Sequence, residues 1–596
     1  MYETQIGRMV RSRVEQYGTR ALLYYRPAGS SDLKTMSWTE FGSDLDRLSV
    51  RLMDIDIRPG ENVGIFSPNM PEWTLGSLAI VSVRGVTVPL HTVSALQHIE
   101  FIVRQTEMRV IFVGEQVQLD TILALLPQLP SIERIIVFDD EVDISSSNIA
   151  VHYSAFMKRE ITDSDSIALK ERLEAATEDD LAAILYTSGT TGTPKGTMLS
   201  HRNFLGSIRN HEQRVDLNCR DVSLCFLPLS HVFEHAWTYY CLHNGVTIYY
   251  LREPRQIIEY LKIARPTVLA SVPRIFEKAY DEIHRLQGQA ATLKRRLFTW
   301  AIELGQMRLS LRLENRPIPP LVALGFPIAE ALVFRKIRGI FGGRLKFSPV
   351  GGAHLSDKII RFFMAAGVYI NFGYGATETV TTSSCQIPYG YSPGTVGMPM
   401  PGTEIRIDVN GEILIRGESV FQGYYKNDGE TAARLVDGWY RSGDLGEIND
   451  SGELIFLGRL NDIFKTSTNR MVHPGLTEDR LAREELISSA ILFGEARKYV
   501  SALVVPNMDA LETTVSSMGI RYNDIKELLV HPEITRLFEE IIGRSQSGMV
   551  DYETIKRFTL LPEDFSIEKG EMTATFKLRR SVISEKYAAV IDSMYA

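Results

Sequence analysis

Short runs of apolar residues alternate with amphipathic stretches along the first third of the chain. The runs are continuously apolar and rich in β-branched residues, as in strands that are covered on both faces of a parallel sheet. We predict strands at 62–66, 86–90, 109–114 and 134–138. The helices predicted between them are 73–83, 94–104 and 119–126. This order is typical of βαβ crossovers.

The same pattern returns after residue 240. Strands are predicted at 246–251, 267–271 and 346–350, and residues 275–340 are largely helical in pattern. No uncharged apolar stretch reaches the 18 residues of a membrane span. The nearest stretch is 317–334, which contains Glu330. There we expect a helix covered by the rest of the protein, with a helix on a membrane surface as the alternative.

The pattern changes to alternating strands near residue 400. Segments 404–409 and 412–416 flank an Asn-Gly turn, which is a strong hairpin signal, and a second hairpin is predicted at 445–457. A mixed α/β segment follows. We therefore predict an α/β fold with a large N-terminal domain of parallel sheets (1–458, including a smaller antiparallel β subdomain at about 400–458) and a small, mobile C-terminal domain (459–596).

Composition narrows the function classes. The 596 residues include 65 basic and 73 acidic side chains, a net charge of −8, which argues against nucleic acid as the main partner. The four cysteines have no CxxC spacing, so we expect reduced, mostly buried thiols. The N-terminus lacks the pattern of a signal peptide. We expect a cytoplasmic protein, with peripheral membrane contact as an open alternative.

A glycine-rich segment, Tyr186–Gly196, follows the apolar run 181–185. It reads Tyr-Thr-Ser-Gly-Thr-Thr-Gly-Thr-Pro-Lys-Gly. Backbone N–H groups, hydroxyls and one cation on a loop after a buried strand suit a polyphosphate. The glycines do not meet the GxxxxGK[ST] spacing, so a conventional P-loop kinase or ATPase is excluded.

Further clusters follow the glycine-rich segment in order along the chain. They include Phe-Leu-Pro-Leu-Ser-His-Val-Phe-Glu (226–234), Gly-Gly-Ala (351–353), Gly-Tyr-Gly-Ala-Thr-Glu (373–378), Phe-Gln-Gly-Tyr-Tyr-Lys (421–426) and Asp-Gly-Trp-Tyr-Arg-Ser-Gly-Asp-Leu (437–445). As an ordered set they resemble the acyl-adenylate-forming superfamily of acyl-CoA synthetases, luciferases and peptide-synthetase adenylation domains. The likeness covers essentially the whole chain and is strongest to bacterial long-chain fatty acyl-CoA synthetases.

The resemblance implies a two-step reaction with ATP, Mg²⁺ and CoA. A fatty acid carboxylate attacks the α-phosphate, pyrophosphate leaves, and a thiol then displaces AMP. Because the first step brings two anions together, cations and N–H donors must be preorganised around the phosphates. By resemblance, the β- and γ-phosphates are bound by Thr187, Ser188, Gly189, Thr190, Thr191, Gly192 and Lys195. Thr377 and Glu378 bind the α-phosphate, and Glu378 with Thr187 holds Mg²⁺.

The resemblance assigns the remaining contacts residue by residue. Tyr374 lies against adenine, and the backbone of Gly351, Gly352 and Ala353 lines the other face of the base. Asp444 takes the ribose hydroxyls. Arg459 reaches the ribose and phosphate from the hinge at 459–462, about which the C-terminal domain is expected to rotate.

The catalytic groups implied by resemblance are His231, near the acyl carboxylate, and Lys577, which bridges the carboxylate and the α-phosphate as a compact point charge. Two departures from the family pattern fall nearby. Ser-Thr-Asn-Arg (467–470) replaces a glycine-containing segment, although Arg470 still supplies a cation, and Ala574 stands where proline is common.

Three hypotheses about the function stay open. The first is an AMP-forming ligase that transfers a medium- or long-chain acyl group to CoA. The second is a fatty acyl-AMP ligase that loads the phosphopantetheine of an acyl carrier protein. The third is a nucleotide-binding homologue without activity. The acyl chain length and the oligomeric state, including a homodimer, are not specified by the sequence.

Overall fold

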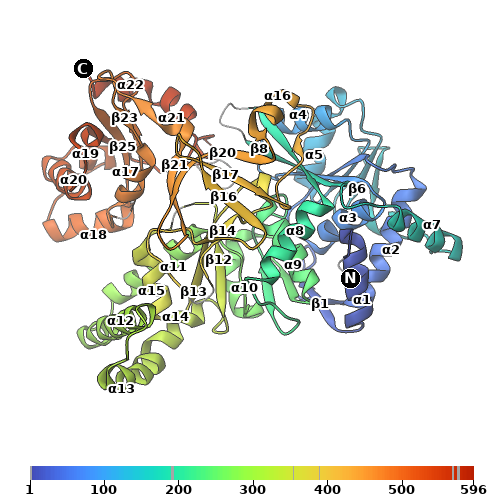
Figure 1. The fold of residues 1–596 in the computed structure, drawn as a ribbon, viewed down its shortest axis with the longest axis horizontal. Coiled ribbons are helices and arrows are strands. Elements are labelled where there is room, and N and C mark those ends of the chain that lie inside the picture. The colour runs from blue at the N-terminus through green and yellow to red at the C-terminus, as the bar shows by residue number, and fades with distance from the viewer. Residues whose placement is uncertain are drawn as a thin grey trace. The chain divides into compact units, whose positions relative to one another are not determined.

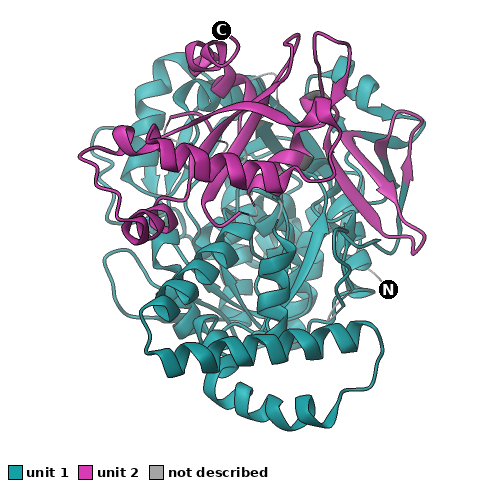
Figure 2. Cartoon of the chain, turned by 90° about the vertical axis from the view of Figure 1, so that its left-hand side faces the viewer, with its two compact units in different colours: residues 1–405, 414–441 teal, residues 406–413, 442–596 magenta. Residues whose placement is uncertain are grey.

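The computed structural model describes residues 3–188, 193–353, 355–387, 390–482, 484–566, 569–572 and 578–596. The chain divides into two compact units (Figure 2). The first unit contains residues 1–405 and 414–441, and the second contains residues 406–413 and 442–596. The predicted boundary at 459–462 lies inside the second unit.

An eight-stranded, mostly parallel sheet lies in the first unit, in the order β18-β9-β8-β4-β3-β5-β6-β7 (Figure 1). Its strands are β3 (Asn62–Phe66), β4 (Val86–Leu90), β5 (Val110–Val113), β6 (Arg134–Val137), β7 (Ala150–His152), β8 (Leu181–Ser188), β9 (Pro194–Ser200) and β18 (Gly423–Tyr424). Its crossover helices include α3 (Pro71–Ser82), α4 (Leu96–Thr106) and α5 (Gln116–Leu125). Every residue of β3 and β4 is buried, as the continuously apolar pattern predicts.

Two four-stranded sheets also lie in the first unit. One has the order β10-β11-β1-β2, from β10 (Val222–Cys225), β11 (Thr247–Tyr250), β1 (Ala21–Tyr25) and β2 (Lys34–Ser37). The other has the order β12-β13-β14-β15, from β12 (Phe347–Val350), β13 (Tyr369–Tyr374), β14 (Ser384–Cys385) and β15 (Met398–Pro399). The predicted strand at 267–271 is wrong, because only isolated bridges from Val268 and Ser271 reach β12.

Helices surround these sheets and fill the chain between α11 and α14. The long ones early in the unit are α1 (Ile6–Tyr17), α2 (Trp38–Asp54), α7 (Asp163–Glu174), α8 (His201–Glu212) and α9 (Val232–His243). Later come α10 (Ile257–Ala264), α11 (Pro273–Gly288), α12 (Thr292–Leu313), α13 (Pro320–Ala329), a π-helical turn η3 (Glu330–Phe334), α14 (Arg335–Ile340), α15 (Asp357–Ala365) and α16 (Asp428–Arg434).

The expectation that the helix within 317–334 is covered by protein is wrong. Of α13, only Val322 and Ala329 are buried. Leu321 and Leu324 are 84% and 74% exposed. No described helix is long and apolar enough to cross a membrane.

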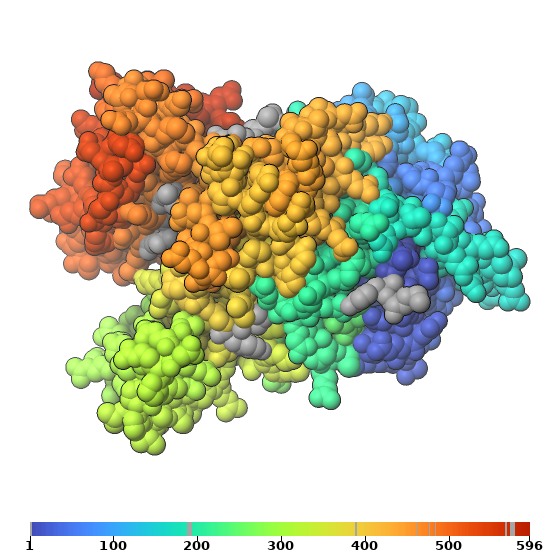
Figure 3. Space-filling model, in the orientation of Figure 1, coloured from blue at the N-terminus to red at the C-terminus, as the bar shows by residue number. Residues whose placement is uncertain are grey.

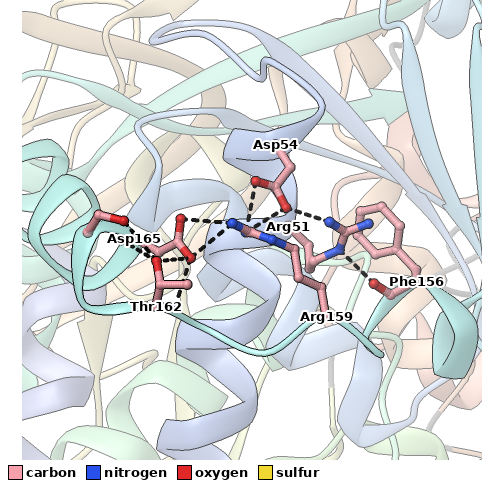
Figure 4. A network of polar contacts seen from close by, with 7 residues as sticks. Arg51, Asp54, Phe156, Arg159, Thr162 and Asp165 are labelled. Carbon is pink, nitrogen blue, oxygen red and sulfur yellow. Dashed lines mark hydrogen bonds and ion pairs between the residues drawn. The ribbon is translucent and has the colours of Figure 1, made fainter.

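A charged cluster fastens the segment after β7 to helix α2 (Figure 4). The Arg159 guanidinium contacts both carboxylate oxygens of Asp54 at 2.9 Å and both of Asp165 at 3.0 Å. Arg51 donates to the Phe156 carbonyl at 2.7 Å and pairs with Asp54. Hydrogen bonds from Thr162, with Arg159 nearby, hold the pKa of Asp165 at about 2. The cluster therefore fixes the start of α7, where Thr162 is the N-cap.

A five-stranded antiparallel sheet contains the two predicted hairpins. Its strands are β16 (Thr403–Ile407), β17 (Glu412–Gly417), β19 (Leu435–Val436), β20 (Trp439–Ile448) and β21 (Leu454–Arg459). The second unit continues with the short pair β22 (Phe464–Lys465) and β23 (Met471–Val472) and a sheet of β24 (Ile487–Phe493), β25 (Val500–Pro506) and β26 (Ile555–Leu560). Its helices are α17 (Pro474–Leu481), α18 (Met508–Met518), α19 (Ile525–Leu529), α20 (Pro532–Ser545), α21 (Arg580–Lys586) and α22 (Ala588–Ser593). This mixed α/β architecture confirms the predicted fold class.

Candidate active site

The glycine-rich segment is mostly a β-hairpin rather than a free loop. Strands β8 and β9 pair antiparallel up to Ser188 and Pro194, with Tyr186 opposite Gly196 and Thr187 opposite Lys195. The predicted loop is therefore shorter, because β structure extends into both of its ends. Gly189, Thr190, Thr191 and Gly192 lie outside the described residues, as does the side chain of Ser188.

Lys195 lies in a cluster of charged side chains from α16. Its Nζ atom contacts Glu430 Oε1 at 2.6 Å, and Glu430 also pairs with Arg434 Nε at 3.2 Å. The hydrogen bond from Lys195 is the main cause that holds the pKa of Glu430 below its ordinary value. Two cations therefore share one carboxylate, which leaves net positive charge beside the end of the hairpin. This donor set suits an anion such as phosphate.

Tyr424 connects this cluster to the predicted metal-holding carboxylate. Lys195 Nζ lies 5.8 Å from the centroid of the Tyr424 ring, and the Tyr424 hydroxyl donates to Glu378 Oε1 at 2.8 Å. Burial, with Glu378 as the next cause, raises the pKa of Tyr424, so the hydroxyl keeps its proton at neutral pH. The structure thus brings Lys195 and Glu378 together around Tyr424, for which no role was predicted.

Glu378 and Thr377 lie on a tight turn after β13, the 3₁₀ turn Thr377–Thr379. The next two residues, Val380 (φ 46°) and Thr381 (φ 76°), are β-branched residues in the left-handed region. Such residues rarely adopt this conformation, and strained backbone of this kind concentrates at functional sites. A Cβ on Gly375 would lie 1.4 Å from the Thr381 carbonyl oxygen, so the turn requires glycine there.

Hydrogen bonds hold this strained turn from several sides. The Thr381 amide donates to the Ala376 carbonyl at 3.1 Å, and the Phe421 amide donates to the Glu378 carbonyl at 2.8 Å. Ser207 Oγ donates to the Val380 carbonyl at 3.2 Å. These contacts therefore fix the backbone that carries Glu378, and the Tyr424 hydroxyl holds its carboxylate.

The residues predicted to line the base lie at neighbouring strand ends. Strands β12 and β13 are parallel, with Val350 opposite Phe372, so Gly351–Ala353 follow the carboxyl end of β12 and Tyr374 is the last residue of β13. Gly352 has a φ of 89°, and a Cβ built on it would meet no atom of the described residues within 4 Å. The described residues therefore leave room beside Gly352 at the carboxyl ends of these strands, where ligands bind in open α/β sheets.

His231 is the N-cap of α9 and accepts a hydrogen bond from the Phe233 amide at Nδ1, 3.3 Å away. Its ring lies 6.3 Å from that of His91, and burial lowers the pKa of His91 to about 4. Glu234 follows within the first turn of α9 and is fully buried. Burial raises the pKa of Glu234 to about 8, and its Oε2 accepts from the Leu227 amide at 3.2 Å. Glu234 therefore fastens the loop 226–231 that carries His231.

Asp444 and Arg459 are paired residues in the second unit. They lie opposite each other on β20 and β21, and Arg459 Nε is 3.7 Å from Asp444 Oδ1. Gly443 adopts a φ of 73°, and its amide donates to the buried Glu412 at 2.9 Å. The backbone before Asp444 is therefore held by a carboxylate from the first hairpin.

Arg470 closes a turn between β22 and β23. Its carbonyl accepts from the Thr466 amide at 2.9 Å, and its guanidinium lies 5.6 Å from the Tyr552 ring centroid. Asn469 takes the left-handed position (φ 59°). Asparagine tolerates this conformation better than other residues with a Cβ, so it replaces the glycine that the family pattern leads one to expect.

Lys577 and Ala574 lie outside the described residues. The chain on either side of them is anchored by Glu571, which is fully buried. Glu571 pairs with Lys586 at 2.7 Å and accepts from the Tyr587 hydroxyl at 3.0 Å. Met572 and Leu578 form an antiparallel bridge. The backbone is therefore paired immediately before and after residues 573–577.

The first unit contains groups that fit a bound nucleotide with a metal ion. Described residues hold no group of three or more metal-ligating His, Cys, Asp or Glu side chains. Mg²⁺ needs none, since it is commonly held by one or two carboxylates with phosphate oxygens and water. Glu378, with its carboxylate oriented by Tyr424, and the cations beside the β8–β9 hairpin meet this requirement.

Comparison with known families and proteins gives matches along both parts of the chain. The AMP-binding enzyme profile matches residues 10–425, and the profile of the AMP-binding enzyme C-terminal domain matches residues 461–596. The long-chain-fatty-acid–CoA ligase FadD15 of Mycobacterium bovis is 30% identical over 566 residues, 93% of this chain and 91% of its own length. The peroxisomal long chain acyl-CoA synthetase 6 of Arabidopsis thaliana is also 30% identical, over 95% of this chain and 82% of its own.

Solved structures share the fold at lower identity. The anthranilate CoA ligase AuaEII in complex with anthranoyl-AMP superposes with a TM-score of 0.72 at 16% identity, covering 98% of both chains. The A-PCP didomain of carboxylic acid reductase from Segniliparus rugosus in complex with AMP gives a TM-score of 0.74 at 21% identity, covering all of this chain and 82% of its own.

Proposed function

The chain belongs to the AMP-binding enzyme family, and from that premise we propose that it activates a medium- or long-chain fatty acid with ATP and transfers the acyl group to CoA. The observation that carries the proposal is the 30% identity to a long-chain-fatty-acid–CoA ligase over 93% of the chain. A likeness that spans both family profiles supports both half-reactions, whereas a match to the first profile alone would support only adenylation.

The proposed first step joins the fatty acid to AMP. A carboxylate oxygen attacks the α-phosphorus of ATP, the bond from the α-phosphorus to the bridging oxygen breaks, and pyrophosphate leaves. Lys195 and the hairpin amides bind the departing phosphates, and Arg434 adds positive charge nearby. Mg²⁺, when bound, would neutralise phosphate charge, and Glu378 with Thr187 would hold it. Tyr424 and the strained turn orient Glu378 for this role.

Lys577 is proposed to bridge the carboxylate and the α-phosphate, which brings two anions together. Thr377 binds the α-phosphate, while Gly351–Ala353 and Tyr374 enclose the base. Asp444 and Arg459 bind the ribose and the phosphate.

In the proposed second step the thiol sulfur attacks the acyl carbon, and AMP leaves. His231 lies near the acyl carboxylate, and Arg470 supplies a cation near the phosphate. Rotation of the C-terminal segment about 459–462 between the steps stays a prediction. Asn461→Pro is then expected to impair one half-reaction and spare the other, whereas equal rates in both would contradict the rotation.

A carrier protein is the second candidate acceptor. The observation in its favour is the likeness to an A-PCP didomain, although at 21% identity this supports the fold alone. Peripheral membrane contact and dimerisation also stay predictions.

Exchange of pyrophosphate into ATP that depends on an added carboxylic acid tests the first step. Fatty acids and aromatic acids are compared as substrates. We expect exchange with fatty acids in the wild type and its loss in Lys577→Ala. Equal exchange in both would contradict the role of Lys577, and none in the wild type would favour an inactive homologue. CoA and a phosphopantetheinylated carrier protein are then offered in parallel, and acylation of the carrier alone would replace CoA as the acceptor.

A further inference from the structure

Helices α12 and α13 expose an unusual amount of apolar surface. The exposed side chains, which we call the apolar face, are Leu293, Trp300, Met307, Leu321, Leu324, Ile328 and Leu332. The three on α12 are seven residues apart, and those that begin on α13 follow at intervals of three and four. Each set therefore lies along one side of its helix.

The two sets are neighbours. Helices α12 and α13 pack side by side in the first unit (Figure 1). A Cβ built on Gly325 of α13 would lie 3.3 Å from the Trp300 ring, between the α12 and α13 sets. Figure 3 shows this part of the chain, in lime green, at the molecular surface. The apolar face is thus one area rather than scattered residues.

Basic residues are concentrated in the segment that carries the apolar face. Residues 292–344 contain ten basic and three acidic residues, a net charge of +7 in a chain whose total is −8. Lys294, Arg295, Arg296, Arg335 and Lys336 are exposed and form no ion pair with any residue that the structure describes. An isolated positive region on an acidic protein is complementary to an anionic partner.

We propose that α12 and α13 dock the protein on the surface of an anionic phospholipid bilayer. Leucine, isoleucine and tryptophan side chains enter the boundary between headgroups and acyl chains, and exposed lysines and arginines of the same segment contact the headgroups. Tryptophan prefers this boundary. Neither helix spans the bilayer, in agreement with the absence of a spanning helix among the described residues. This docking is independent of which acid or thiol the enzyme uses.

A second copy of the chain fits this surface less well. A two-fold symmetric contact would place the apolar face against itself and would bring both basic regions together. Residues 292–344 contain only three acidic side chains that could offset this repulsion, Glu303, Glu314 and Glu330, and the last two already pair with arginines.

Vesicle flotation of the full-length protein tests the docking without ATP, acid or CoA. Vesicles of phosphatidylglycerol and phosphatidylcholine are compared with vesicles of phosphatidylcholine alone, at 0.1 M and 0.5 M salt. We expect binding to the anionic vesicles, and weaker binding at the higher salt, where charges are screened.

Two variants separate the apolar and the charged contributions. Leu321→Gln/Leu324→Gln/Ile328→Gln is expected to lower vesicle affinity by about a thousandfold or more, since each of the three buried aliphatic side chains contributes about tenfold or more. Arg295→Gln/Arg296→Gln is expected to lower it by about fivefold for each arginine.

Matched controls alter exposed residues elsewhere in the first unit. Val117→Gln/Ile167→Gln/Ile258→Gln and Arg220→Gln/Arg255→Gln are expected to bind vesicles as the wild type does. The proposal would be overturned if the wild type bound anionic and neutral vesicles equally. It would also be overturned if variants and controls lost the same amount of vesicle affinity. A different oligomeric state of the α13 variant and the wild type in the absence of vesicles would also overturn it. That result would identify a second copy of the chain as the partner of the apolar face. Thermal unfolding of each variant verifies that it is folded.

Discussion

Tyr424→Phe removes one hydroxyl from the centre of the candidate site. That hydroxyl donates to Glu378 Oε1 at 2.8 Å, from a side chain that is only 4% exposed. A hydrogen bond to a charged group contributes about 1.5–3 kcal/mol, equivalent to roughly a tenfold to hundredfold change in an equilibrium. Loss of a group that orients a metal-holding carboxylate weakens metal affinity by about the same factor. We therefore expect the apparent affinity for Mg²⁺ to fall at least about tenfold.

The assay is fatty-acid-dependent exchange of pyrophosphate into ATP, titrated with Mg²⁺. Tyr425→Phe is the matched control, because this neighbouring hydroxyl accepts from Asn62 Nδ2 at 3.1 Å and does not contact Glu378. A shifted Mg²⁺ dependence in Tyr424→Phe, with a melting temperature close to that of the control, would support orientation of Glu378. The reasoning is refuted if Tyr424→Phe keeps the wild-type Mg²⁺ dependence, or if both variants lose the same amount.

Three further substitutions probe other parts of the structure. Gly375→Ala places a Cβ 1.4 Å from the Thr381 carbonyl oxygen and is expected to lower the melting temperature and abolish exchange, whereas Gly429→Ala, where a Cβ meets no atom within 4 Å, is expected to be tolerated. The folded-state pKa of Glu234, about 8, is higher than its unfolded value, so the free energy of unfolding decreases as pH rises from about 4.5 to 8, by up to about 1.4 kcal/mol per pH unit. Between pH 6 and pH 8 the melting temperature should therefore decrease less in Glu234→Gln than in the wild type. An equal decrease in both proteins would contradict this expectation. Burial opposes ionisation of Glu571, but hydrogen bonds, led by that from Lys586, lower its pKa below the ordinary value. The ionised Glu571 therefore stabilises the fold at neutral pH, and this contribution is lost as pH falls below about 4.5. Glu571→Gln should lower the free energy of unfolding of the full chain by about 2 kcal/mol at pH 7, measured with denaturant, and no difference from wild type would argue against its anchoring role.

The sequence predicts the framework well where burial pattern determines structure. Strands 62–66 and 86–90 appear as predicted, because a continuously apolar run bounded by helical stretches fits a covered parallel strand. The Asn-Gly hairpin also appears, since turn chemistry is local. The segment 267–271 has the same apolar pattern but forms only isolated bridges, because pairing depends on a partner strand about 80 residues away.

The candidate site is less accessible to sequence reasoning, because its contacts join distant residues. The carboxylate that pairs with Lys195 lies 235 positions later, and the tyrosine that orients Glu378 lies 46 positions later. Neither partner belongs to the motif that it serves. The left-handed conformations of Val380 and Thr381 are likewise imposed by surrounding hydrogen bonds rather than by local propensity. The exposure of α13 is decided by which neighbours pack against it, and apolar content alone predicted the opposite.

The stoichiometry of products from one fatty acid tests the proposed function most directly. Wild-type protein is incubated with a long-chain fatty acid, ATP, Mg²⁺ and CoA, and the acyl-CoA, AMP and pyrophosphate are quantified by chromatography and mass spectrometry. We predict equal amounts of all three, and none of them when the fatty acid is omitted. Formation of ADP in place of AMP, or AMP and pyrophosphate without acyl-CoA, would contradict an AMP-forming fatty acid–CoA ligase.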